Sequence, residues 1–241
     1  MRFRTIVCAL MTATLLAFST GSAPAKTAPT SLERLAQQQT NLLLKFYQGQ
    51  NVSPPKCGQG QGSDGIDGVL LLPVVSFAPG NRTINCKTSA RSVLIDLGGF
   101  AITEDNRFPA SSYPLEGQDV PFSRANLEPI CDDFIAHDFF SDPIPIPVPA
   151  TLDGRSITGR VLNSGVFTAR VNRHAQTPGP EGVDLYADSV ALGHPGRLGT
   201  VFCGSKAKVH LRPGTHKIVV DYSELFDGLS TKFTYKITVR G

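Results

Sequence analysis

The sequence lacks the biases that mark several large classes of protein. Its 23 Lys and Arg residues nearly balance its 20 Asp and Glu residues, and a net charge of +3 is too weak to indicate binding to nucleic acid or to a membrane surface. The composition is not that of collagen-like, coiled-coil or extended low-complexity chains, and 41% hydrophobic residues argue against wholesale disorder. A chain of 241 residues of this kind suits one domain, or one domain with a small appendage.

Signatures of common enzymes and metal sites are also missing. The chain has no GxSxG elbow for a serine nucleophile. Ser53-Pro54-Pro55-Lys56 matches SxxK formally, but its two prolines prevent the helix on which that motif works. No close CxxC pair is present, which argues against a zinc site. The sequence therefore names no catalytic residue and no cofactor.

The first 25 residues predict an export signal. Arg2 and Arg4 form a positive region, an apolar stretch runs from Ile6 to Phe18, and Ala23-Pro24-Ala25 offers small residues to a signal peptidase. The apolar stretch is shorter than the roughly 20 residues that a membrane span needs, and no later segment is long and apolar enough. We predict cleavage between Ala25 and Lys26, and a secreted, extracytoplasmic mature chain without a membrane span.

Cleavage there removes Cys8 and leaves four cysteines, at positions 57, 86, 131 and 203. An even number of cysteines in a secreted chain indicates two disulfides, for which three pairings are possible.

One helix is signalled near the start of the mature chain. Thr30-Ser31-Leu32-Glu33 is a capping box, and Gly49 ends the pattern. The apolar residues at near-helical spacing are Leu32, Leu35, Leu42, Leu43 and Phe46. The Gly-rich stretch from Gly58 to Gly68 then predicts a flexible loop. Its Asp64 and Asp67 could ligate Ca²⁺, but they lack the pattern of an EF-hand loop.

The later chain predicts strands. Residues 231–240 alternate strictly between apolar and polar, which indicates a strand with one buried and one solvated face. Further apolar faces are predicted for Ile218, Val220 and Tyr222, for Ala207, Val209 and Leu211, and for Phe167, Ala169 and Val171. The opposite face of the 207–211 strand carries Lys206, Lys208 and His210, which we expect to face water.

Two apolar runs, Val69–Phe77 and Arg91–Leu97, flank a turn at Gly80 and predict a hairpin-like return. Residues 123–140 predict a second helix, capped by Ser123 and disturbed by Pro129. Prolines at every second position from 143 to 149 then require an extended, polyproline-like segment, which is either an interdomain linker or a segment lying along the body.

These patterns predict a mainly β protein, an antiparallel β-sandwich of immunoglobulin-like character with an N-terminal and a mid-chain helix. The expected organisation is a signal peptide at 1–25, a helix and linker at 26–56, and a disulfide-stapled sandwich at 57–241.

Several short motifs occur in this last region: Lys56-Cys57-Gly58, Thr83-Ile84-Asn85-Cys86, Leu152-Asp153-Gly154-Arg155, Ser164-Gly165-Val166-Phe167, Leu211-Arg212-Pro213-Gly214-Thr215-His216 and the closing Phe233–Val239 strand. In them the chain resembles a widespread, uncharacterised family of secreted, mainly bacterial β-sandwich proteins. The resemblance implies the fold, and it implies no activity, cofactor or site residue. Members carry a cysteine after the second strand where this chain has residues 102–105, and Cys203 lies on a later strand instead.

With this resemblance in view, we predict the pairs Cys57–Cys86 and Cys131–Cys203. The first encloses the Gly-rich loop and the first strand. The second ties the mid-chain helix to a late strand and replaces the family cysteine that is missing here.

The densest polar cluster runs from Cys131 to Asp138. On a helix, Asp133 and His137 share a face, which suits a metal site or an ordinary carboxylate–imidazole pair. Two ligands are half a metal site, so we interpret the cluster as a solvated face and keep Asp133 and His137 as weak metal candidates. Asn51 and Asn81 begin glycosylation sequons, which matter only in a host that glycosylates.

Two classes of function fit these observations. We favour a secreted, non-catalytic binding or structural module that presents loops to an extracellular ligand, namely a glycan, an envelope component or a protein. The alternative is a secreted hydrolase or metal-assisted enzyme that uses Asp133 and His137.

Overall fold

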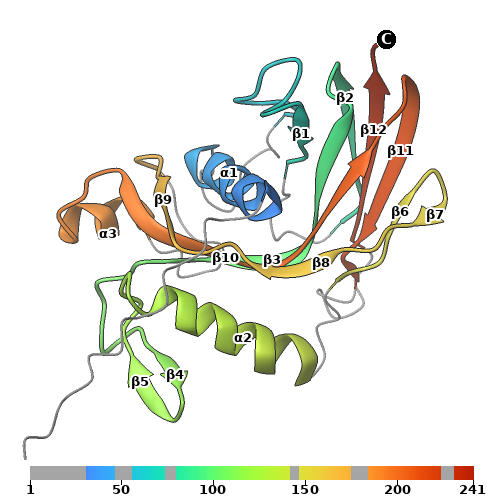
Figure 1. Cartoon of the computed structure of the whole chain (residues 1–241). Coiled ribbons are helices and arrows are strands. Elements are labelled where there is room, and N and C mark those ends of the chain that lie inside the picture. Colours follow the sequence, from blue (N-terminus) through green and yellow to red (C-terminus); the bar gives the residue numbers. More distant parts are fainter. Residues whose placement is uncertain (1–30, 47–55, 74–79, 142–146, 175–183, 224–230) are drawn as a thin grey trace, which may run out of the picture.

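The computed structural model describes residues 31–46, 56–73, 80–141, 147–174, 184–223 and 231–241. The predicted export signal and its cleavage site lie outside these ranges. Within them the protein is mainly β, as predicted (Figure 1). The helices are α1 (Ser31–Phe46), α2 (Leu127–Ser141) and α3 (Leu185–Ala191). The strands are β1 (Val69–Leu71), β2 (Arg82–Thr88), β3 (Ser92–Thr103), β4 (Tyr113–Leu115), β5 (Gln118–Val120), β6 (Ala150–Leu152), β7 (Arg155–Ser156), β8 (Arg160–Asn163), β9 (Phe167–Arg170), β10 (Arg197–His210), β11 (Gly214–Asp221) and β12 (Lys232–Val239).

The strands form two five-stranded sheets and a separate β4–β5 hairpin. The β3–β10 sheet has the order β1-β3-β10-β8, with β9 also paired to β10, and the β11–β12 sheet has the order β2-β12-β11-β6-β7. Both sheets are mixed, because β1 is parallel to β3 and β2 is parallel to β12. The expectation of purely antiparallel sheets is therefore wrong, and so is the hairpin-like return. β1 and β3 are parallel neighbours, and the chain between them contributes β2 to the other sheet.

One core cluster is shared by the two sheets. On β12 the alternation holds as predicted: Phe233, Tyr235, Ile237 and Val239 are buried and pack against residues of the β3–β10 sheet. The other sheet contributes Leu70, Leu72, Val93, Ile95, Leu97 and Ala207. Val148 of the proline-rich segment also joins this core and donates its N–H to Leu97 O at 2.9 Å. The described part of that segment thus lies along the body, and residues 142–146 are outside the described ranges.

α1 covers the opposite face of the β3–β10 sheet (Figure 1). Leu35 packs with Leu71 and Leu94, and Ala36 packs with Phe202. The buried stripe of the helix is Leu35, Ala36, Gln39, Thr40 and Leu44, which only partly matches the predicted set. The predicted cap, Thr30, lies outside the described residues.

α2 packs on the face of the β3–β10 sheet opposite α1 (Figure 1). It lies over the part of β10 that carries Val201 and Cys203. It begins at Leu127 rather than Ser123, so Pro129 falls in the first turn, where its missing N–H removes no helical hydrogen bond. Cys131 of α2 is bonded to Cys203 of β10 with 5.5 Å between their Cα atoms, and Cys57 is bonded to Cys86 with 5.3 Å. These are the two pairs that the sequence analysis predicts.

The Gly-rich stretch is a series of turns held by hydrogen bonds, more ordered than the sequence predicts. The Gln61 amide donates to Leu71 O at 2.7 Å and accepts from Leu71 N at 2.8 Å. The Gln61 side chain therefore pairs with the backbone N–H and C=O of Leu71 at the outer edge of β1, as a neighbouring strand would.

Candidate functional site

The predicted Asp133–His137 pair exists on α2. His137 Nδ1 lies 3.1 Å from Asp133 Oδ1, and the Tyr113 hydroxyl donates to Asp133 Oδ2 at 2.9 Å. The His137 side chain is 71% exposed. Among the residues that the structure describes, no group of three or more His, Cys, Asp or Glu side chains gathers where it could hold a metal ion. The arrangement has the geometry of a carboxylate–imidazole pair on a helix surface.

The aspartates of the Gly-rich stretch are engaged in local contacts. Asp64 accepts hydrogen bonds from Ser63 and Ser89, and these bonds, that of Ser89 first, lower its pKa. Asp67 is exposed in a left-handed backbone conformation at a turn. Within the described ranges, no further His, Cys, Asp or Glu side chain joins these two aspartates where it could help to hold a metal ion.

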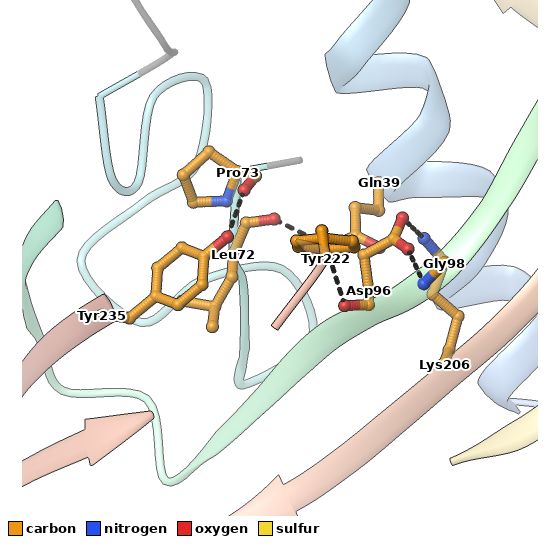
Figure 2. A network of polar contacts seen from close by, with 8 residues as sticks. All are labelled: Gln39, Leu72, Pro73, Asp96, Gly98, Lys206, Tyr222 and Tyr235. Carbon is orange, nitrogen blue, oxygen red and sulfur yellow. Dashed lines mark hydrogen bonds and ion pairs between the residues drawn. The ribbon is translucent and has the colours of Figure 1, made fainter. Parts of the chain in front are cut away.

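The densest buried polar cluster was missed by sequence reasoning. The ammonium of Lys206 contacts Asp96 Oδ2, and the two side chains are 1% and 9% exposed (Figure 2). The expectation that Lys206 faces water is therefore wrong. Lys208 and His210 lie on the same face of β10 and are exposed as predicted. The difference is that the Phe202 ring, on which Ala36 of α1 packs, covers the Lys206 ammonium.

A bulge in β3 positions the two partners. Lys206 pairs with Asp96, whereas Gly204 pairs with Gly99, so two residues of β3, Leu97 and Gly98, lie opposite one residue of β10, Ser205. The Gly98 N–H donates to Asp96 Oδ1 at 2.8 Å. Both carboxylate oxygens thus have a donor, one from the backbone and one from Lys206.

Phe202 covers the ammonium. Lys206 Nζ lies 3.8 Å from the centroid of the Phe202 ring, a cation–π distance. The ring has room because Gly99 and Gly204 lie beneath it. A Cβ on Gly204 would be 2.5 Å from the Gly99 Cα atom and 2.9 Å from the ring, and a Cβ on Gly99 would be 2.8 Å from the ring. The two glycines are therefore part of the pocket that seats Lys206.

A frame of polar side chains joins the layers around the pair (Figure 2). Gln39 of α1 donates to Leu72 O at 2.7 Å, and Tyr235 of β12 donates to Pro73 O at 2.9 Å. Tyr222 donates to the backbone O of Asp96 at 2.8 Å. Burial, and secondarily the charge of Asp96, raises the pKa of both phenols, so they remain protonated donors.

The electrostatics of Lys206 are unusual for a lysine. Burial lowers the pKa of its ammonium, and the adjacent Asp96 carboxylate opposes that shift. An ammonium has three N–H donors, and Asp96 Oδ2 is the only hydrogen-bond acceptor for them within the described ranges. An amine in this place can act as a nucleophile once it loses its proton.

A second carboxylate joins two surface turns. His216 Nδ1 lies 2.8 Å from Asp153 Oδ2, and His216 Nε2 lies 2.9 Å from Arg212 O. Both ring nitrogens face acceptors, so the doubly protonated imidazolium fits best, and the hydrogen bond to Asp153 raises the pKa of His216. The same bond, followed by that from Lys217 N, lowers the pKa of Asp153. The pair connects the two turns of the LDGR and LRPGTH motifs.

We expect this pair to make stability depend on pH. The raised pKa of His216 gives a contribution that is complete below its ordinary value of 6.5 and is lost as pH rises through the folded value. The lowered pKa of Asp153 gives one that is present above 3.8 and is lost as pH falls through the folded value. Denaturant midpoints of wild type and His216→Gln should therefore differ most between pH 3.8 and pH 6.5, and should converge as the pH rises through the folded-state pKa of His216. His210→Gln is the exposed control. A difference that grows toward alkaline pH would contradict the assignment.

The end of the β3–β10 sheet presents the most exposed apolar side chains. We call residues 104–112 and α3 the loop end; they adjoin because Thr103 at the end of β3 pairs with Thr200 near the start of β10. Phe108 is 47% exposed there and Val190 is 49% exposed. Among the described residues, these two are the exposed large hydrophobic side chains.

Charged groups surround these apolar residues. Arg107 Nε donates to both oxygens of Asp105, at 2.8 and 2.9 Å, and this interaction lowers the pKa of the carboxyl against the effect of burial. Asp188 of α3 is 7% exposed, and burial, followed by the charge of Asp105, raises its pKa. Arg107 also interacts electrostatically with Asp188, which links the loop to the helix.

Comparisons with known proteins gave no match, whether to a protein family, to a curated protein or to a solved structure. None of the helices within the described ranges combines the length and apolarity needed to cross a membrane.

Proposed function

We propose that this chain is a secreted, non-catalytic binding module built on an immunoglobulin-like sandwich, and that its loop end binds the extracellular ligand. The observation that carries the proposal is the exposure of Phe108 and Val190 on adjoining segments of one end. Exposed apolar side chains beside an arginine are typical of the central residues of binding surfaces.

The scaffold beneath the loop end suits this role. The backbone of Glu104 pairs with Gly199, its carboxylate accepts the Gly199 N–H, and Asp105 N donates to Phe122 O at 3.0 Å. Asp184 caps α3 by accepting from Tyr186 N and Ala187 N. The segments that carry Phe108 and Val190 are thus fixed by backbone contacts, which limits the entropy lost on binding. Two disulfides and the predicted export signal support an extracytoplasmic location.

The test measures retention of the purified chain on washed cell envelopes, which hold both glycan and protein. We expect saturable retention, and we expect Phe108→Ser with Val190→Ser to weaken it by about tenfold or more. Lys236→Ser with Thr238→Ser, on the exposed face of β12, is the control surface. Envelopes treated with protease or with glycan hydrolases distinguish a protein from a glycan ligand. Undiminished retention of the loop-end variant, or no retention of wild type, would contradict the proposal.

The alternative, a metal-assisted enzyme centred on Asp133 and His137, makes a different prediction. The Asp133 carboxylate already contacts Tyr113 and His137, so we expect a chelator to leave the melting temperature of wild type unchanged. Asp133→Ala with His137→Ala should remove a partly exposed pair of roughly 0–1 kcal/mol together with the Tyr113 hydrogen bond, and should shift melting by only a few degrees. A chelator-induced drop in wild type that the double variant lacks would favour the enzyme, because a metal bound only to the folded state stabilises it.

A further inference from the structure

We propose that Lys206 and Asp96 are a modification site: the two side chains condense to an intramolecular amide that links β10 to β3. The proposal concerns the inside of the fold and is independent of the ligand that the loop end binds. It rests on three observations, namely the placement of the two groups, their burial, and the donor held on the second carboxylate oxygen.

Placement brings the nucleophile to the carbon it would attack. Lys206 and Asp96 are directly paired across the strands, and Nζ is in hydrogen-bond contact with Oδ2, which is bonded to Cγ. Such contact replaces an encounter in solution by a reaction between neighbours held in position, which is worth many orders of magnitude in rate.

Burial favours the uncharged form of Lys206. The side chains are 1% and 9% exposed, and Nζ lies over the Phe202 ring with Asp96 Oδ2 as its single described acceptor. Transfer of one proton from the ammonium to Oδ2 gives a neutral amine and a neutral acid and removes two buried charges. The lowered pKa of Lys206 acts in the same direction.

The remaining oxygen has a fixed donor. When Nζ attacks Cγ, the negative charge develops on Oδ1, which already accepts the Gly98 N–H at 2.8 Å. A backbone N–H in this position stabilises the oxyanion of a tetrahedral intermediate. Oδ2 then leaves with its proton and with a second proton from the nitrogen, so one amide forms and one water departs. No oxidant, metal or further reactant is needed.

Mass spectrometry of the intact chain tests the proposal. After full reduction, which removes any mass change due to disulfides, the wild type should be one water lighter than its sequence. Trypsin should fail to cleave after Lys206 and should release Ser92–Arg107 joined to Leu198–Lys208 as one branched peptide. A chain of full mass, or separate peptides ending at Arg107 and Lys206, would overturn the proposal.

Three variants make the result specific. Lys206→Arg, which keeps a charge but has no primary amine, should regain the full mass, and Lys208→Met should keep the wild-type deficit. Asp96→Asn should form the same amide by loss of ammonia instead of water, so its deficit should be that of ammonia. Loss of water that persists in Lys206→Arg would indicate a cyclic imide at one of the aspartates, and would overturn the proposal.

Discussion

Replacing Lys206 by methionine while Asp96 stays in place is expected to lower the free energy of unfolding by about 3–5 kcal/mol. The Asp96 side chain is 9% exposed, and the substitution leaves its carboxyl group there without a partner. An uncompensated charge in such a site costs far more free energy than a surface ion pair contributes. The expectation holds whether the wild-type side chains are joined as an ion pair or as an amide. Denaturant unfolding measures the effect.

A double substitution identifies its cause. Lys206→Met with Asp96→Asn removes both charges, while the Asn oxygen still accepts the Gly98 N–H, so most of the lost stability should return. Lys208→Met, on the same face of β10 but exposed, should change stability by less than about 0.5 kcal/mol. A double variant as unstable as Lys206→Met would show that packing of the lysine stem, and not the buried charge, dominates.

Lys206 also shows where sequence reasoning stops. Its parity with Lys208 and His210 was predicted correctly, because side chains alternate strictly along a strand. Whether a face meets water depends on what covers it, and the cover here is the Phe202 ring with α1 packed on it, more than 160 residues earlier in the chain. The pattern of β10 therefore predicts its faces, while the burial of Lys206 is decided by a tertiary contact.

The direction of some strands and the length of β10 could not be predicted from the sequence for similar reasons. Alternation in β12 predicted its buried face, but nothing local specifies that β2 lies beside it in parallel. The first half of β10 is buried on both faces by α1 and α2, so it has no alternation to detect. The short helix α3 was missed although Asp184 is an N-cap residue that could have signalled it.

The predicted functional residues divide in the same way. Asp133 and His137 meet because helical spacing alone brings them together. The loop end and the Lys206–Asp96 pair combine segments about 80 and 110 residues apart, which only the fold brings into contact. The sequence could supply the local pair, and it could not rank that pair against sites that depend on tertiary structure.

The second large effect is expected from the disulfide between α2 and β10. Its removal by Cys131→Ala with Cys203→Ala opens a loop of 72 residues, which corresponds to about 4 kcal/mol in the chain-entropy model. Both cysteines are fully buried beside Leu127 and Val201, so lost packing adds to this cost. Cys57→Ala with Cys86→Ala, a loop of 29 residues, is the matched variant and should lose about 3–4 kcal/mol.

The two disulfide variants should differ in where protection is lost. Without the Cys131–Cys203 bond, α2 is held to the sheet by side-chain packing and by the hydrogen bonds of Asn163 to Glu128 O and Asp132 Oδ1. Its amides should then exchange faster than those of β12 under native conditions. Without the Cys57–Cys86 bond, faster exchange should instead appear in the Gly-rich turns and β2. Hydrogen exchange read by mass spectrometry separates these outcomes. Equal protection of α2 in both variants would mean that Leu127 and its neighbours dock the helix without the disulfide, and that the bond acts only on the unfolded chain.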